Sequence, residues 1–203
     1  ASPFTLMGED ENYTYLLLCS PHIWGEAATI MFTSVRVACW NTLTQAMSKS
    51  LTDKFRLLHT RSFQDVRAAA ELTVEQTLIQ KAVYEQKIKL LAETPLVDLT
   101  ALYNYIAAVM QPTGCRDKGT PLSELGKPAQ TVLMNYHTAP GSKLASASGT
   151  YWGAFNAITY YYDHQYGRSG ADNRLYEAWL SHKNAVIKRK AFDIALAHAQ
   201  AAA

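Results

Sequence analysis

Polar residues inside otherwise apolar stretches are the part of this chain whose types could do chemistry. They are Arg36, Asn41, His59, Asn156 and His164. Burying such groups costs free energy unless they are hydrogen-bonded. One interpretation is therefore a buried network that joins a strand, a helix and a C-terminal helix. In the other, some of them line a cleft, with Arg36 foremost because a guanidinium group fits phosphate or carboxylate.

Cysteine and histidine residues raise two further possibilities. Cys19, Cys39, His22 and His59 are of the types that bind zinc, but no C-x-x-C or H-x-x-x-H spacing of zinc sites occurs in the sequence. Cys39 could act as a nucleophile with His59 as its base, although a lone cysteine more commonly packs as a small hydrophobe. We expect no metal site, no cofactor and no catalytic residue, and an enzyme built around Cys39, His59 and Arg36 is the alternative.

Basic residues gather in two places and suit contacts with a phosphate backbone. One group surrounds residues 54–61 and the other is a run at residues 188–190. A solvated surface is the usual explanation of such charges. If both groups shared one face, they would follow a nucleic-acid backbone without reading its sequence. The predicted nucleic-acid-binding residues are Arg36, Lys54, Arg56, Arg61, Lys188, Arg189 and Lys190.

Aromatic residues are concentrated at residues 151–166. On a helix, Tyr151, Phe155, Ile158 and Tyr162 share one face, which predicts core packing. The other tyrosines of this segment cannot all lie on that face. Some of Tyr160, Tyr161 and Tyr166 are therefore expected to be exposed or to meet another subunit, and an exposed tyrosine could stack on unpaired bases.

The order of predicted elements places these residues in an α+β fold. Strands are expected at residues 13–19, 27–32 and 54–60, and residues 35–39 form a third strand or continue the second past a bulge. A helix is expected at 40–49. A long helix at 62–93 is followed by helices at 96–110, 129–137, 150–166, 172–179 and 184–199, with a loop at 111–128 and a mobile segment at 139–148. The prediction is a short antiparallel sheet in the N-terminal third, then a long helix and a mostly helical C-terminal half. Residues 1–60 form the strand-rich part, expected to be incomplete at its N-terminus, and residues 61–203 form the helical part of the same domain.

Composition supports a folded protein. The 203 residues are 48% hydrophobic and 18% charged, and the net charge of +2 does not by itself indicate nucleic-acid binding. An odd number of cysteines without paired spacing favours a reducing cytoplasm over a disulfide framework. No apolar run is long enough for a membrane span, so no membrane partner is expected.

Residues 32–43, 55–60 and 149–164, with a weaker segment at 183–192, together resemble one family. In order and spacing they are similar to the phage/plasmid-like proteins grouped as domain of unknown function 932. One departure lies at residues 21–25, where Pro-His-Ile-Trp-Gly replaces an expected His-Asp-Gly. The resemblance implies a role in DNA metabolism of mobile elements, without a settled activity. The strand-rich front and long helix also resemble single-strand annealing recombinases, by analogy of fold only.

These observations predict a non-enzymatic protein of a phage or plasmid, located in the bacterial cytoplasm. It is expected to form homo-oligomers and to bind or anneal single-stranded DNA. The alternative is a structural or assembly protein with an aromatic oligomer interface.

Overall fold

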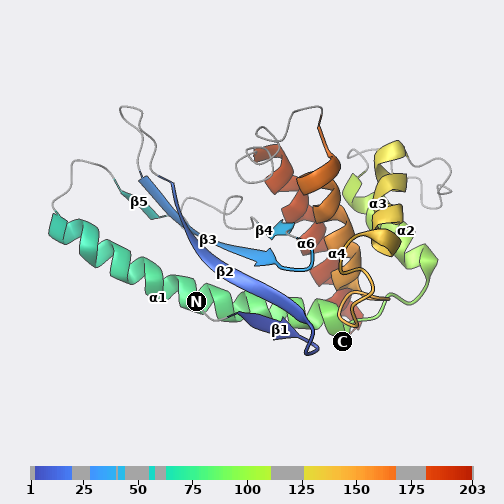
Figure 1. The fold of residues 1–203 in the computed structure, drawn as a ribbon, viewed down its shortest axis with the longest axis horizontal. Coiled ribbons are helices and arrows are strands. Elements are labelled where there is room, and N and C mark those ends of the chain that lie inside the picture. Colours follow the sequence, from blue (N-terminus) through green and yellow to red (C-terminus); the bar gives the residue numbers. More distant parts are fainter. Residues whose placement is uncertain are drawn as a thin grey trace.

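A computed structural model describes residues 3–19, 28–39, 41–43, 55–57, 63–110, 126–167 and 182–202. Strands from the first part of the chain lie along a long helix, and the later helices gather around its C-terminal end (Figure 1). All strand pairings described are antiparallel. The predicted α+β class is confirmed.

The sheet is built around one long hairpin. Its order is β1-β2-β3-β4, and β5 also pairs with β3. Aromatic and β-branched residues favour these strands. The strands are β1 (Phe4–Leu6), β2 (Asp10–Cys19), β3 (Ala28–Arg36), β4 (Asn41–Leu43) and β5 (Phe55–Leu57).

A tight turn sets the register at the start of the sheet. Met7 and Gly8 have positive φ angles of 48° and 80°, and the Glu9 amide donates to the Leu6 carbonyl at 3.2 Å. Positive φ at both central residues is the type I′ geometry that matches the twist of paired strands. The turn brings Asp10 opposite Leu6 at the beginning of β2.

The predicted helix at 40–49 is wrong at its beginning. Residues 41–43 form β4, in which Asn41 pairs with Arg36 and Leu43 with Ser34. A turn at residues 37–39 reverses the chain, so this short segment gains backbone hydrogen bonds along β3. Pairing with a strand already in place outweighs local helical spacing. Of the two alternatives for residues 35–39, continuation of the preceding strand is the one observed, since β3 runs without interruption from Ala28 to Arg36 and residues 37–39 form the turn.

The helices follow the sequence pattern closely. Predictions at 62–93, 96–110, 129–137 and 184–199 are confirmed with small shifts at their ends, and the last turn of the 150–166 prediction is a π-helix. The predicted helix at 172–179 lies outside the described residues. The helices are α1 (Phe63–Glu93), α2 (Leu99–Met110), α3 (Lys127–Thr138), α4 (Tyr151–Tyr160), η4 (Tyr161–Gln165) and α6 (His182–Ala202).

Helix α4 is the centre of the core. It contacts α1, α3 and α6, and Trp152, Phe155 and Ile158 are fully buried. The face predicted for core packing, which also includes Tyr151 and Tyr162, is buried as expected.

The segment before α4 is packed rather than open. Residues 139–149 form turns in which Ser146 and Ala147 are buried, and the expectation of a mobile segment stays a prediction. The Thr150 hydroxyl accepts a hydrogen bond from the Gly153 amide and so caps α4. A Cβ at Gly153 would lie 1.9 Å from the Ala147 carbonyl oxygen, so only glycine permits this close approach.

Candidate functional site

A buried ion pair joins the sheet to the helices. Asp10 at the start of β2 and Arg36 at the end of β3 are 0% and 1% exposed. The Arg36 Nε lies 2.8 and 2.9 Å from the two Asp10 carboxylate oxygens, and its Nη2 lies 2.8 Å from Oδ2. Such a forked contact is the strongest geometry for an arginine and a carboxylate.

Further donors converge on the same carboxylate. The Ser146 hydroxyl and the Trp152 indole Nε1 donate to Asp10 Oδ2 at 2.6 and 2.9 Å. The Arg36 guanidinium donates to the Gly141 carbonyl at 3.1 Å and lies 5.7 Å from the centre of the Trp152 ring. Residues distant in the sequence thus meet at one buried charge.

The contact between Arg36 and the Gly141 carbonyl requires glycine at position 141. Its φ is +74°, and a Cβ there would lie 2.6 Å from the Ala38 Cβ and 3.2 Å from an Arg36 nitrogen. A side chain at this position would push the loop off the guanidinium group.

The environment keeps Arg36 charged. Burial alone lowers the pKa of its guanidinium, but the hydrogen bonds and charge of Asp10, together with Cys39, outweigh burial and raise the pKa above its ordinary value. Arg36 is therefore a fully paired buried cation. It does not lie on the surface, where a phosphate backbone could reach it. The prediction of Arg36 as a nucleic-acid-binding residue is therefore wrong.

Part of the predicted polar network is present next to this pair. The Cys39 thiol lies 3.9 Å from Arg36 Nη1 and 4.0 Å from Asn156 Oδ1, and Asn156 donates to the Trp152 carbonyl at 2.8 Å. His164 Nε2 donates to the Cys39 carbonyl at 2.9 Å. Asn156 and His164 thus join the chain segment after β3 to α4 and η4.

The other two predicted members are placed only in part. Asn41 lies in β4, where the backbone pairs with Arg36, and His59 lies outside the described residues. A cleft of about 10 Å³ borders Arg36, Cys39 and Asn156. This volume suffices for about one water molecule, so this cleft offers no room for a substrate.

A second buried ion pair ties η4 to α6. Lys188 donates to the Asp163 carboxylate, and both side chains are almost fully buried. Burial lowers the pKa of Lys188, and the charge of Asp163 opposes that effect. Lys188 therefore holds two helical segments of the protein together. Its prediction as a nucleic-acid-binding residue is wrong.

The rest of the 188–190 run does not form a basic patch. Arg189 is exposed and lies 3.5 Å from the Asp193 carboxylate one turn later, which partly neutralises it. The Lys190 ammonium donates to the Val109 carbonyl of α2 at 3.1 Å. The three residues point to three different partners, as consecutive positions on a helix must.

The first basic group is described only at Arg56, whose backbone in β5 pairs with Thr29 of β3. Lys54 and Arg61 lie outside the described residues. Their prediction as nucleic-acid-binding residues stays a prediction.

The tyrosines after α4 pack on one another. The Tyr161, Tyr162 and Tyr166 rings have centroids 5.1 to 6.0 Å apart, and Tyr160 lies 4.6 Å from the His164 ring. These rings are half-buried or buried, so the expectation of surplus exposed aromatics at this helix is not supported.

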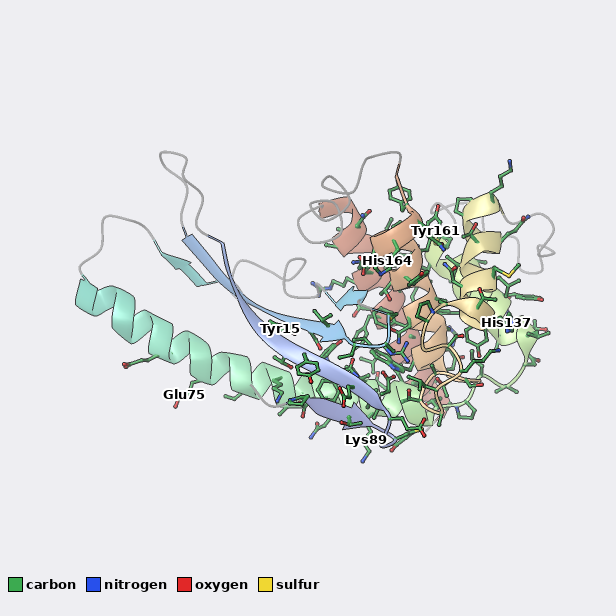
Figure 2. All side chains as sticks on the ribbon, in the orientation of Figure 1. Tyr15, Glu75, Lys89, His137, Tyr161 and His164 are labelled. Atoms are coloured by element: carbon green, nitrogen blue, oxygen red, sulfur yellow. The ribbon has the colours of Figure 1, made fainter. Side chains whose placement is uncertain are left out.

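A different aromatic pair lies on the β2–β3 hairpin, with Tyr13 half-buried and Tyr15 exposed. The Tyr13 and Tyr15 rings are stacked, with centroids 6.4 Å apart and planes inclined by 28°. Tyr15 is 47% exposed. It lies apart from the helical cluster that holds His137, Tyr161 and His164 (Figure 2).

Sequence reasoning missed Asp10 and this tyrosine pair for the same reason. Along β2, Asp10, Asn12 and Thr14 are buried while Glu11 and Tyr15 are exposed, so the polar row faces inward and the aromatic row faces outward. The alternation of polar and aromatic residues at positions 12–15 was the available signal, and it starts two residues after Asp10. It extends the strand into a segment that otherwise resembles a polar loop.

Two further features, a metal site and a membrane-spanning helix, are not found among the described residues. Within the described ranges, no group of three His, Cys, Asp or Glu side chains is arranged to hold a metal ion. Each helix in those ranges is too short or too polar to cross a bilayer.

Comparison with curated proteins and with solved structures gives no match. The sequence model of one family, described as Domain of unknown function (DUF932), matches residues 1–184. The match spans the strands, the buried Asp10–Arg36 pair and helices α1 to α4, and it agrees with the resemblance found at residues 32–43, 55–60 and 149–164. The chain therefore belongs to the family of domain of unknown function 932.

Proposed function

We propose that this protein binds single-stranded nucleic acid on the outward face of the β2–β3 hairpin, as a DNA-binding or annealing protein of a phage or plasmid. The observation that carries the proposal is the stacked pair of Tyr13 and Tyr15 on this face, in which Tyr13 is half-buried and Tyr15 is exposed. Aromatic rings on an open sheet face are a recurrent platform for unpaired bases. Every base has a π-face, so such binding tolerates any sequence.

The charges along the sheet indicate the direction in which the backbone of a bound single strand would run. Glu9 and Glu11 are exposed near the β1 end of β2 and repel phosphates. Arg56 belongs to β5, which pairs with the other end of β3. By the register of these strands, the backbone position of Arg56 belongs to the same face of the sheet as the positions of Tyr13 and Val35. We expect the phosphates to run from the tyrosines toward β5 and the neighbouring Lys54 and Arg61.

The test is fluorescence anisotropy of labelled oligo-dT with the full-length protein and two variants, Tyr13→Leu and Tyr15→Leu. Because stacking contributes about 1–3 kcal/mol per base, each variant should weaken binding by about five- to hundredfold. The matched control is Tyr103→Leu, a half-buried tyrosine on α2, which should bind as the unaltered protein does.

Arg56→Gln separates phosphate contact from stacking. Losing one phosphate contact should make the slope of log affinity against log salt less steep by about 0.7. Unchanged affinity of both tyrosine variants, with native circular dichroism, would overturn the proposal.

A second candidate function is the assembly of several copies of the chain. An aromatic interface at η4 is disfavoured by the mutual packing of its tyrosines. A row of exposed apolar residues on α1 favours assembly through a different surface.

A further inference from the structure

A pocket lies at the C-terminal end of α3, beside the turns that lead to α4. Its volume is about 530 Å³, within the range of sites that bind small molecules. All the residues that line it fall within positions 137–144. It is far larger than the cleft beside Arg36 and Cys39, so a ligand of substantial size fits there.

The polar groups around this pocket favour an anion. Lys143 supplies a positive charge and His137 a ring N–H donor, and both line the pocket and are exposed. None of the described residues that line it is acidic, and the sequence has no aspartate or glutamate between Glu124 and Asp163. A hollow lined by one sign of charge attracts ions of the opposite sign.

The end of α3 itself does not oppose an anion strongly, because its last carbonyl groups already accept hydrogen bonds. The Thr138 hydroxyl donates to the Met134 carbonyl at 2.8 Å, and the Ser142 hydroxyl donates to the His137 carbonyl at 3.2 Å. These donors offset part of the negative charge at the end of the helix dipole. Within the part of the chain that the structure describes, Lys143 has no carboxylate partner, so its ammonium group is available to a ligand.

The buried ion pair holds the wall of the pocket from behind. Arg36 donates to the Gly141 carbonyl at 3.1 Å, and the Ser146 hydroxyl donates to the Asp10 carboxylate at 2.6 Å. Lys143 therefore lies between two positions that are fixed to the core. Support of this kind keeps a binding site in one geometry before the ligand arrives.

We propose that this pocket binds a small phosphate monoester, with Lys143 and His137 in contact with the phosphate. A phosphate monoester carries close to two negative charges at neutral pH and accepts several hydrogen bonds, so it gains more from these two donors than a carboxylate does. The volume leaves room for an organic group beside the phosphate, and a nucleoside monophosphate is of fitting size.

This site is distinct from the tyrosine-bearing sheet face, because His137 and Tyr15 lie apart in Figure 2. The proposal does not depend on nucleic-acid binding.

The first test is calorimetric titration of the full-length protein with thymidine monophosphate and, separately, with thymidine. The monophosphate should bind at least about tenfold more tightly than the nucleoside, since only it offers charged acceptors to Lys143 and His137. Lys143→Gln and His137→Gln should each weaken binding of the monophosphate by about fivefold or more. The matched control is Lys127→Gln, which removes an exposed lysine at the other end of α3 that does not line the pocket, and its affinity should be unchanged.

Equal affinity for the two probes, no binding of the monophosphate at millimolar concentration, or full affinity in both pocket variants would overturn the proposal.

The second test distinguishes a free monoester from the phosphodiester backbone of nucleic acid. Oligo-dT without a terminal phosphate should not displace thymidine monophosphate, because its phosphates are diesters with one charge each. Displacement by this oligonucleotide, lost in Lys143→Gln, would instead identify the pocket as part of a nucleic-acid surface and would overturn the assignment to a small ligand.

Discussion

At the scale of single residues, the molecule is organised around Asp10. One carboxylate accepts hydrogen bonds from Arg36, Ser146 and Trp152, which come from β3, the turns before α4 and α4 itself. A buried ion pair is a weak source of net stability, but removing one partner leaves the other charge uncompensated. The position therefore specifies how the sheet docks on the helices.

We predict that Asp10→Ala lowers the free energy of unfolding by about 3–5 kcal/mol, because it leaves the Arg36 charge buried without its counter-ion. Urea unfolding followed by circular dichroism measures the change. The matched control is Asp193→Ala, which breaks the exposed pair with Arg189 and should change stability by less than about 0.5 kcal/mol. A loss below about 1 kcal/mol for Asp10→Ala would show that the carboxylate does not hold the sheet to α4.

At the scale of elements, α4 depends on the turns that precede it. Thr150 caps the helix, the Leu96 amide donates to the Gly149 carbonyl at 2.8 Å, and Gly153 packs directly on Ala147. The backbone of residues 146–150 thus packs between α4 and the chain that follows α1.

Gly153→Ala is expected to destabilise the protein by about 2 kcal/mol or more, because the added methyl group overlaps the Ala147 carbonyl in a packed core. Gly126→Ala is the control, since its Cβ would be an ordinary 3.7 Å from Pro128. Thermal unfolding of the two variants should show a large drop in melting temperature for the first and a much smaller one for the second, which changes only the N-cap residue of α3. Equal melting temperatures would contradict the close approach.

The helices were predictable from sequence for a local reason. The three- and four-residue spacing of apolar positions and the Thr94-Pro95 stop define α1, and its observed end at Glu93 agrees. By contrast, β4 is a three-residue strand that pairs with β3. Local spacing cannot reveal a pairing that depends on a distant strand.

The site was predictable only in part. Arg36, Asn156 and His164 stood out as polar residues in apolar stretches, and the structure brings them together around Cys39. Asp10 did not stand out, because its own neighbours in sequence are polar and its partners lie 26 to 142 residues away. The basic run at 188–190 suggested a patch, yet a helix turns successive side chains toward different surroundings.

At the scale of the whole molecule, buried tyrosines make the free energy of unfolding depend on pH in the alkaline range. Burial raises the pKa of Tyr162 to about 12 from an ordinary 10.0, and its neighbours Tyr161 and Tyr166 add to the rise. Burial also raises the pKa of Tyr84 and of Tyr105 well above the ordinary value. Above pH 10 the unfolded chain loses phenol protons that the native state keeps, so stability must fall as pH rises.

We therefore expect the free energy of unfolding to decline from about pH 10 upward. Tyr162→Phe removes one of the responsible groups and should make the decline to pH 12 shallower by about 1 kcal/mol. Denaturant titrations at a series of alkaline pH values measure the slope. If Tyr162→Phe followed the unaltered protein throughout that range, the phenol would not be the linked group.

Binding of nucleic acid to the sheet face is tested by comparing the affinities of labelled single-stranded and duplex DNA for the full-length protein across a salt series. Stacking on the sheet face needs unpaired bases, and phosphate contacts release counterions. We predict binding that favours single strands and weakens as the salt concentration rises. Absence of binding at low salt, or equal affinity for duplex and single strands, would contradict it.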